Sequence, residues 1–391
     1  MTCSIPEHSD TPVATIPPLP FGRQRQDAHT LADLTTMGVG GPFARLVEAT
    51  TEEEIIHTIT EADSAGVPLL VVGGGSNILA ADQAFEGVVL RDTRSHIALT
   101  QEGGCEGVNL HVLAGTPWDT LVVRAIENEW SGIEALSGIP GTVGAAPVQN
   151  IGAYGHEISS TVARVHTWDR VKGERREFAS DELGFGYRTS VLKESLKDGW
   201  SPSPRYIVLA VDFQLRIASL SAPVLYGQLA RRLGVPVGAR VPASEVRAAV
   251  LDLRRSKGMV LDDADRDTYS CGSFFTNPVL TEAQAAELPA DAPRYDVVDN
   301  RRATLNVGAP RIPGLVKTSA AWLIDYAGFH AGYGMPGPAA LSTKHCLALT
   351  NRGGATSADI KELAQTIQKG VRGAYGITLQ PEPIIVGGSD A

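Results

Sequence analysis

An apolar stretch, Val67–Val72, runs directly into five small residues, and this junction restricts the fold more than any other feature of the chain. The five are Gly73, Gly74, Gly75, Ser76 and Asn77. After a strand, successive backbone N–H groups with no side chains in the way form a cradle for an anion such as a pyrophosphate. This segment contains neither the fingerprint GxGxxG nor a P-loop lysine, so it matches neither common nucleotide loop. Alone, the segment is equally compatible with a plain tight turn.

A second segment rich in glycine and small residues spans 137–155. Two loops without bulk suit a large flat ligand that is pressed against backbone. Gln149 and Asn150 have amides for hydrogen bonds to the edge of a ring, and Tyr154 has a ring that can stack on it. The segment also contains Ser137, Gly138, Ile139, Pro140, Gly141, Thr142, Gly144, Ala145, Gly152 and Ala153.

Length and composition indicate a large soluble protein. A chain of 391 residues predicts two or three domains, and its formal charge of -10 argues against a nucleic-acid partner. No apolar run approaches the ~18 residues that a membrane span needs, and the first twenty residues lack the apolar core of a signal peptide. The four scattered cysteines have no metal-like spacing and indicate free thiols in a reducing compartment. We therefore expect a cytoplasmic protein without a membrane partner.

The hydrophobic periodicity predicts an α+β chain. Thr51 and Glu54 form a capping box that begins a helix ending near Gly66, and Ser244 is expected to cap another helix. A composition shift at 218–223 indicates a domain boundary. Further strands are expected at 87–91, 111–114, 162–168, 206–215, 273–280 and 377–386, and helices at 118–127, 244–257, 319–326 and 357–375.

Six motifs occur in a specific order: GGGSN, IPGTVGAAPVQNIGAYG, GYRTSVLK, GSFFTNP, SAAWLID and PEPIIVG. In this order the chain resembles the UDP-N-acetylenolpyruvoylglucosamine reductases from about Leu34 to Gly387. The resemblance implies a two-subdomain FAD-binding fold of the vanillyl-alcohol-oxidase (PCMH) type, followed by an α+β substrate domain. The expected divisions are a flexible tail 1–21, FAD-binding subdomains 22–95 and 96–218, a substrate-binding domain 219–379, and a closing strand and tail 380–391.

The resemblance implies a reaction and its cofactors. NADPH reduces FAD, and the enolpyruvyl ether of UDP-N-acetylglucosamine-enolpyruvate is then reduced to UDP-N-acetylmuramate, a peptidoglycan precursor. The two glycine loops would hold the FAD, and the first contains no histidine for a covalent bond, so the flavin is expected to be non-covalent. We expect small-molecule substrates and a monomeric protein.

Three residues match the family's catalytic positions. Hydride addition to the alkene leaves negative charge beside a carboxylate, so the site must stabilise that charge and supply a proton. Ser273 corresponds to the proton donor, and Arg188 to the arginine that holds the substrate carboxylate. Glu382 corresponds to the catalytic glutamate, although Gln380 and Pro383 depart from the family pattern. A protonated Glu382 would donate to the enolate, and an ionised one would orient Arg188.

Three further residues match substrate contacts: Tyr226, Lys257 and Asn277. Tyr226 resembles the tyrosine of the substrate-closing loop that defines one subtype, and Lys257 resembles a diphosphate-binding lysine. For all three residues, the sequence is nearly as compatible with a solvated position on the surface. The nine histidines lack HxxxH spacing, so no metal is expected. His345 beside Cys346 is rejected as a catalytic pair because neighbours on a strand point to opposite faces.

Two other functions fit parts of the pattern. One is a different flavin oxidoreductase of the same fold that acts on an alcohol or a sugar. The other is a non-catalytic protein that binds a flavin or a nucleotide. Reduction by NADPH without oxygen separates the first from the expected reductase, because an alcohol oxidase of this fold does not accept electrons from NADPH. Retention of Ser273, Arg188 and Glu382, far apart in the chain, argues against the second.

Overall fold

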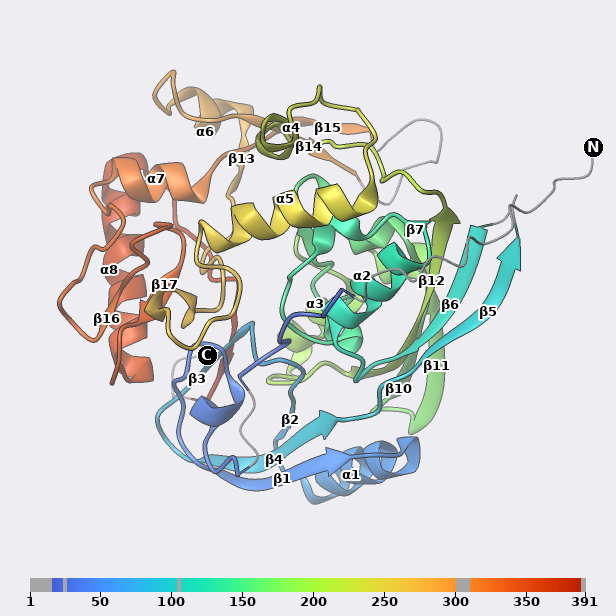
Figure 1. The fold of residues 1–391 in the computed structure, drawn as a ribbon. Coiled ribbons are helices and arrows are strands. Elements are labelled where there is room, and N and C mark those ends of the chain that lie inside the picture. Colours follow the sequence, from blue (N-terminus) through green and yellow to red (C-terminus); the bar gives the residue numbers. More distant parts are fainter. Residues whose placement is uncertain (1–15, 24–26, 104–106, 300–309, 388–391) are drawn as a thin grey trace, which may run out of the picture.

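The computed structural model describes residues 16–23, 27–103, 107–299 and 310–387. Figure 1 shows a parallel sheet at the bottom, a long antiparallel sheet at the right, and the C-terminal helices α7 (Ala320–Tyr326) and α8 (Ser357–Tyr375) at the left. Cys3 and Cys105, two of the cysteines expected to be free, lie outside the described residues, whereas Cys271 and Cys346 are free thiols. Among the described residues, no helix has the length and apolarity needed to cross a membrane.

The first unit is a parallel three-stranded sheet packed against helix α1 (Glu52–Ala65). Its strands, in spatial order, are β1 (Phe43–Ala49), β4 (Phe85–Asp92) and β2 (Leu69–Val71). The predicted capping box is confirmed, since Glu54 N donates to Thr51 Oγ1 at 3.1 Å. Gly66 ends the helix in the left-handed region, which glycine adopts without steric cost. Strand β2 is shorter than the predicted 67–72 because the chain leaves the sheet early to form the glycine loop.

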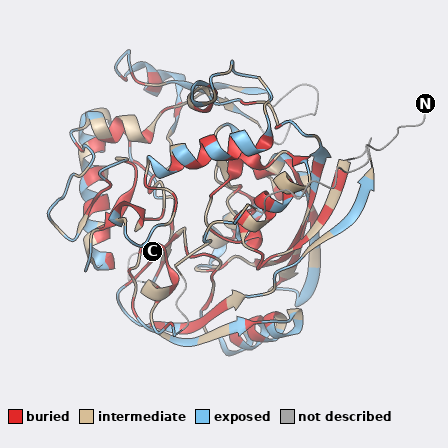
Figure 2. Cartoon of the chain, in the orientation of Figure 1, coloured by how far each residue is buried: buried red, intermediate tan, exposed pale blue. Residues whose placement is uncertain are grey.

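The second unit is an antiparallel sheet with helix α2 (Trp118–Glu127) on its inner face. Its strands are β11 (Glu174–Ala179), β10 (Val162–Asp169), β12 (Tyr206–Ile217), β6 (Gly107–Leu113) and β5 (Ile97–Gly103), with β7 (Trp130–Ser131) beside β12. Trp118 and Leu121 of the helix pack against Val211 and Phe213. Figure 2 shows that the buried residues concentrate on the inner side. The opposite face of this sheet is partly exposed.

The C-terminal part has its own core, built around α8. The predicted apolar face of α8 is confirmed, since Ile360, Leu363, Ala364, Ile367 and Val371 are all buried. The other elements of this part are α4 (Gly227–Leu233), α5 (Ala243–Arg255), α6 (Glu282–Ala286), β13 (Val279–Thr281), β14 (Tyr295–Val298), β15 (Arg311–Lys317), β16 (Ala339–Leu341) and β17 (Leu349–Asn351).

Short elements connect the larger ones. They are α3 (Val191–Glu194), the strand pair β8 (Gly152–Ala153) and β9 (His156–Glu157), and the 3₁₀ helices η1 (Leu31–Leu34), η2 (Glu134–Leu136), η3 (Val143–Ala145), η4 (Ile158–Ser160), η5 (Ser180–Leu183), η6 (Ser195–Asp198) and η7 (Arg266–Thr268).

Two predicted features of the C-terminal part were wrong. Ser244 is not a helix cap: α5 begins one residue earlier, after Pro242, whose fixed φ suits the start of a helix. The range 273–280 is not one strand, because only β13 lies in a sheet and Phe275 forms a single bridge to Pro381. Prolines at 278 and 381 lack the N–H that a longer ladder needs.

The C-terminal end of the described chain returns to the first glycine loop, and the N-terminal end contacts the second unit. The predicted closing strand 377–386 is reduced to β18 (Ile384–Val386), which pairs in parallel with β3 (Ile78–Ala80) directly after the first glycine loop. Residues 1–15 of the predicted flexible tail lie outside the described residues. Its remainder is held by three hydrogen bonds: Ile16 N donates to Glu127 Oε1 at 2.9 Å, Leu19 N donates to Asp119 Oδ2 at 2.7 Å, and Gly141 N donates to Phe21 O at 2.8 Å.

Candidate active site

A cavity of about 1010 Å³ lies where the three parts meet, and both glycine loops line it. This volume is at the upper end of the ~300–1,000 Å³ typical of small-molecule sites, so a cofactor and part of a substrate fit together. The predicted cofactor residues that line the cavity are Gly73, Gly74, Gly75, Ser76, Asn77, Ile139, Pro140, Gly141, Thr142, Gly144, Ala145, Gln149, Gly152, Ala153 and Tyr154.

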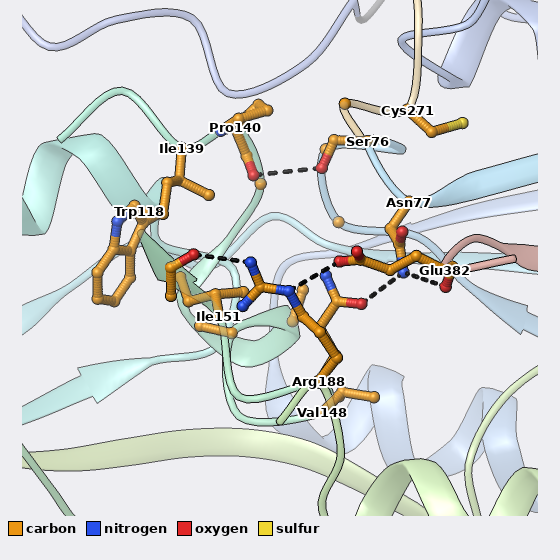
Figure 3. Close-up of a pocket in the computed structure, with 18 of the residues that line it drawn as sticks. Ser76, Asn77, Trp118, Ile139, Pro140, Val148, Ile151, Arg188, Cys271 and Glu382 are labelled. Carbon is orange, nitrogen blue, oxygen red and sulfur yellow. Dashed lines mark hydrogen bonds and ion pairs between the residues drawn. The ribbon is translucent and has the colours of Figure 1, made fainter. Parts of the chain in front are cut away.

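The two loops touch through backbone. A Cβ on Gly74 would lie 1.9 Å from Phe21 O and 2.8 Å from Gly141 Cα, so only glycine fits between the segments. Ser76 Oγ donates to Pro140 O at 3.2 Å, and Asn77 Nδ2 donates to Gln149 Oε1 at 2.7 Å (Figure 3). The loops therefore form one continuous wall of backbone, which fits the pyrophosphate and ring system of a dinucleotide.

Three predicted cofactor residues lie behind this wall and do not line the cavity. Ser137 is buried and donates to Glu134 O at 2.6 Å. Gly138 N donates to Asp119 Oδ1 at 2.8 Å, and the carboxylate of Asp119 is also held by both Nη atoms of the buried Arg247, at 2.7 Å each. Asn150 donates to Glu157 Oε2 at 2.8 Å and to Gly186 O at 3.0 Å. In this structure all three hold the loop in shape.

Arg188 and Glu382 meet in the cavity. Arg188 Nε lies 3.0 Å from Glu382 Oε1 in an ion pair whose angle does not make an aligned hydrogen bond (Figure 3). Arg188 Nη2 donates to Gly152 O at 2.8 Å, which fixes the guanidinium against the second loop. The backbone of Arg188 is left-handed, with φ of 56°. Such strain in a non-glycine residue is typical of functional sites.

The environment of Glu382 makes its carboxyl group harder to ionise than that of an ordinary glutamic acid. Its side chain is only 11% exposed, and this burial raises the pKa of the carboxyl group, although Arg188 and Lys193 oppose the rise. Gln380, two residues earlier, is exposed and does not line the cavity. Its carbonyl accepts from Thr276 N at 3.0 Å. Of the two positions, 382 is therefore the one whose side chain faces the cavity, and it carries the carboxyl group.

Ser273 lines the same cavity, and backbone bonds tie its segment to Glu382. Glu382 N donates to Phe274 O at 2.8 Å, and Phe274 N donates to Leu347 O at 2.8 Å. The neighbouring Cys271 is buried, and its thiol donates to Ile78 O at 3.3 Å. Burial raises the pKa of Cys271 to about 12, so this thiol stays protonated and unreactive at neutral pH.

The three predicted substrate residues also line the cavity. Tyr226 lies at the rim, 43% exposed and edge-on to Tyr154 with ring centroids 5.8 Å apart. Lys257 Nζ donates to Gln228 Oε1 at 3.0 Å. Asn277 Oδ1 accepts from Ala320 N at 2.9 Å and so also anchors helix α7.

Several cations in the cavity were missed by the sequence reasoning. Lys193, Arg254 and Lys317 line it together with Arg188 and Lys257, so positive charge converges locally in an acidic protein. Burial lowers the pKa of Lys317, whose Nζ lies 4.6 Å from the centroid of the Tyr187 ring. Lys193 ends the motif GYRTSVLK but was given no role, whereas Arg254 and Lys317 lie outside the quoted motifs and only the fold places them in the cavity.

His345 lies in a turn that faces the cavity, not on the expected strand. His345 and Cys346 lie in the turn before β17, not on a strand, so the strand argument against pairing them was wrong. Cys346 still points elsewhere, since its thiol donates to Ala321 O at 3.4 Å. His345 lines the cavity; burial and then the charge of Lys257 lower its pKa to about 4, so the imidazole is neutral at pH 7.

Comparison with known proteins agrees with this architecture. A family model described as an FAD binding domain matches residues 43–178, and one described as the UDP-N-acetylenolpyruvoylglucosamine reductase C-terminal domain matches residues 264–386. A reductase of that name from Cutibacterium acnes is 49% identical, over 91% of this chain and 89% of its own length. One from Thermobifida fusca is also 49% identical, over 91% and 96%.

A solved structure leads to the same result. The crystal structure of UDP-N-acetylenolpyruvylglucosamine reductase (MurB) from Thermus caldophilus matches 92% of this chain and 97% of its own, with a TM-score of 0.59 and 26% identity. The predicted fold class, an FAD-binding α+β fold with a further C-terminal part, is thereby confirmed. With matching family models, relatives near half identity along most of the chain, and this shared fold, the protein belongs to the UDP-N-acetylenolpyruvoylglucosamine reductase family.

Proposed function

We propose that this protein uses NADPH and FAD to reduce UDP-N-acetylglucosamine-enolpyruvate to UDP-N-acetylmuramate, as a cytoplasmic monomer. The observation that carries the proposal is the position of the Arg188–Glu382 pair beside the Ser273 segment, in a cavity walled by both glycine loops. Family membership supports the substrate and the cofactors. Within the chain, 22–95 and 96–218 serve as the flavin-binding part and 219–379 as the substrate-binding part.

The glycine loops would hold the FAD. Backbone N–H groups of the first loop suit its pyrophosphate, and the wall formed with Gln149 and Tyr154 suits its ring system. When bound, the flavin supplies hydride transfer, taking the hydride from NADPH and passing it to the substrate. The protein's part is to position the substrate, to exclude water and to stabilise charge.

The three proposed catalytic side chains stabilise or neutralise the negative charge that hydride addition creates. The substrate carboxylate lies against Arg188, whose permanent charge stabilises the negative charge that develops beside it. Glu382, which is buried and has a raised pKa, donates a hydrogen bond to the same group in its protonated form. The Ser273 hydroxyl gives its proton to the carbon next to the carboxylate, which is basic enough at that stage to accept it.

The outer cavity residues suit the diphosphate of the UDP group. Lys257 and Lys317 supply positive charge there, and Asn277 offers its amide N–H. Tyr226, at the rim, closes over the sugar nucleotide after it has entered. The overall charge of -10 would repel such an anion, so this local cluster is needed to bind it.

The proposal is tested by two anaerobic mixing experiments on the purified holoprotein. NADPH should bleach the flavin absorbance, and the enolpyruvyl substrate should then restore it and yield UDP-N-acetylmuramate by mass spectrometry. A flavin that an alcohol or a sugar bleaches but NADPH does not would favour an oxidase of the same fold. A flavin that none of these compounds bleaches would favour a binding protein.

The flavin should be released completely by acid. The first loop has Ser76 and no histidine to form a covalent bond, so we expect the protein to purify yellow and to release all of its flavin as FAD on acid precipitation. Absorbance of supernatant and pellet at 450 nm checks this. Yellow pellets, or a colourless protein that ignores added FAD, would contradict the cofactor assignment.

Replacement of Tyr226 should affect the substrate and leave the flavin unchanged. Tyr226→Phe removes the hydroxyl at the rim, and we expect the Michaelis constant for the UDP-sugar to rise about 10-fold, the value of one lost hydrogen bond of ~1.4 kcal/mol. The FAD spectrum should not change. Tyr326→Phe, on an exposed tyrosine outside the cavity, is the matched control. Equal Michaelis constants for both variants would assign Tyr226 to the surface.

A further inference from the structure

Four charged or titratable side chains form a row across the outer face of the antiparallel sheet. Strands β11, β10, β12 and β6 are neighbours in that order, and the row consists of Glu177, His166, Asp212 and His111. Along β6, Val108, Leu110 and Val112 point into the core, so His111 between them points outward. His111, His166 and Asp212 do not line the cavity, so the row has no part in the proposed reaction.

Three members of the row converge on one point. His111 Nδ1 lies 2.6 Å from Asp212 Oδ1, and His166 Nε2 lies 2.8 Å from Asp212 Oδ2. One ligand atom from each of the three lies within 4.8 Å of the other two. Zn²⁺ lies about 2.0–2.2 Å from nitrogen and oxygen ligands, so two ligands of one ion are about 3–3.5 Å apart. Small side-chain rotations would bring the three atoms to this spacing.

Glu177 holds His166 in the orientation that a metal ligand needs. His166 Nδ1 lies 3.3 Å from Glu177 Oε1, on the side of the ring away from Asp212. Glu177 is itself paired with Arg164, 2.5 Å away. Histidines that bind a metal through one ring nitrogen usually donate the other N–H to a carboxylate, which fixes the tautomer and raises the basicity of the ligand. This arrangement leaves Nε2 of His166 aimed at Asp212 and the point of convergence.

We propose that His111 Nδ1, His166 Nε2 and a carboxylate oxygen of Asp212 bind one divalent transition-metal ion, with Glu177 as the outer partner of His166. Two imidazoles and one carboxylate favour Zn²⁺, Ni²⁺ or Cu²⁺ over Mg²⁺ and Ca²⁺, which prefer oxygen ligands alone. All three side chains are partly exposed, so the ion has a path from solvent. It would join three neighbouring strands and act on the stability of the sheet, outside the catalytic cavity.

The test is a Zn²⁺ titration of the FAD-loaded protein by isothermal calorimetry. Wild type should bind one ion saturably, and His111→Gln, His166→Gln and Asp212→Asn should each weaken binding more than about 100-fold, beyond the effect of an outer partner. Glu177→Gln should weaken it about 10-fold, as loss of an outer carboxylate does. His57→Gln and Glu174→Gln, on exposed residues outside the row, are the matched controls and should bind as wild type does.

A second measurement needs no variant. Diethyl pyrocarbonate modifies accessible imidazoles, and mass spectrometry locates the modified histidines. Zn²⁺ should protect His111 and His166 and leave the exposed His57 reactive. Absence of saturable binding in wild type, equal binding by wild type and His166→Gln, or modification of His111 and His166 that Zn²⁺ does not change would each overturn the proposal.

Discussion

Ser273→Ala should bind FAD and be bleached by NADPH at close to the wild-type rate, while its reoxidation by the enolpyruvyl substrate slows at least ~10²-fold. The reason is that a proton donor acts only after the hydride has left the flavin. The serine lines the cavity within a segment that backbone hydrogen bonds fix to Glu382, so loss of its hydroxyl should leave the cavity intact. Stopped-flow absorbance of the two half-reactions measures the two rates separately.

Two further variants make this test specific. Ser273→Cys should recover part of the lost rate, because a thiol also donates a proton. Cys271→Ala should react as wild type does, since the buried thiol donates to Ile78 O and its pKa is raised to about 12. If Ser273→Ala slows both half-reactions equally, the serine has a structural role and the proposed proton transfer is wrong.

Glu382→Gln should slow the reaction with the enolpyruvyl substrate by at least ~10²-fold, again as expected for a side chain that acts on the developing charge. Gln380→Glu should have almost no effect, although Gln380 is one of the two departures from the family pattern. The position-380 side chain is exposed and outside the cavity, whereas Glu382 faces Arg188. If Glu382→Gln kept the wild-type rate and Gln380→Glu changed it, the closing segment would have been matched to the family pattern at the wrong residue.

The pH profile of the same reaction identifies the role of Glu382. Burial raises its pKa, so the protonated form persists to higher pH than in an ordinary glutamic acid. If this form donates a hydrogen bond, the rate falls as pH rises through the raised pKa, and Glu382→Gln lacks this limb. Glu382 should also make folding stability depend on pH in the same direction. Its contribution is complete below the pKa that Glu382 has in the unfolded chain, and it is lost as pH rises through the pKa of Glu382 in the folded protein. A wild-type rate that falls instead toward acid pH would indicate an ionised Glu382.

Local patterns predicted the helices well and the irregular segments poorly. The apolar stripe of α8 and the capping box of α1 depend on residues close in sequence, so their periodicity was sufficient. The range 273–280 has strand-like residues, but its hydrogen bonds go to Leu347 and Gln380, which no local pattern reveals. Ser244 resembles a cap, yet Pro242 begins the helix.

The same distinction applies to the sites. Motif resemblance located Arg188, Ser273 and Glu382, but the ion pair between Arg188 and Glu382 joins residues that only the complete fold brings together. His345 was dismissed because a strand was assumed where the chain turns. His111, His166 and Asp212 have no recognisable spacing, since three strands supply them and their register decides that they meet.

The pairing of β18 with β3 has a consequence for synthesis of the chain on the ribosome. The partner of residues 78–80 is residues 384–386, so the first glycine loop stays next to an unpaired strand until nearly all of the described chain has been translated. Asn77, which hydrogen-bonds the carbonyl of Glu382, also gains this contact only at that stage. The first glycine loop therefore cannot reach its final contacts as an early, independent unit, and it is completed in the same step that brings Glu382 beside it.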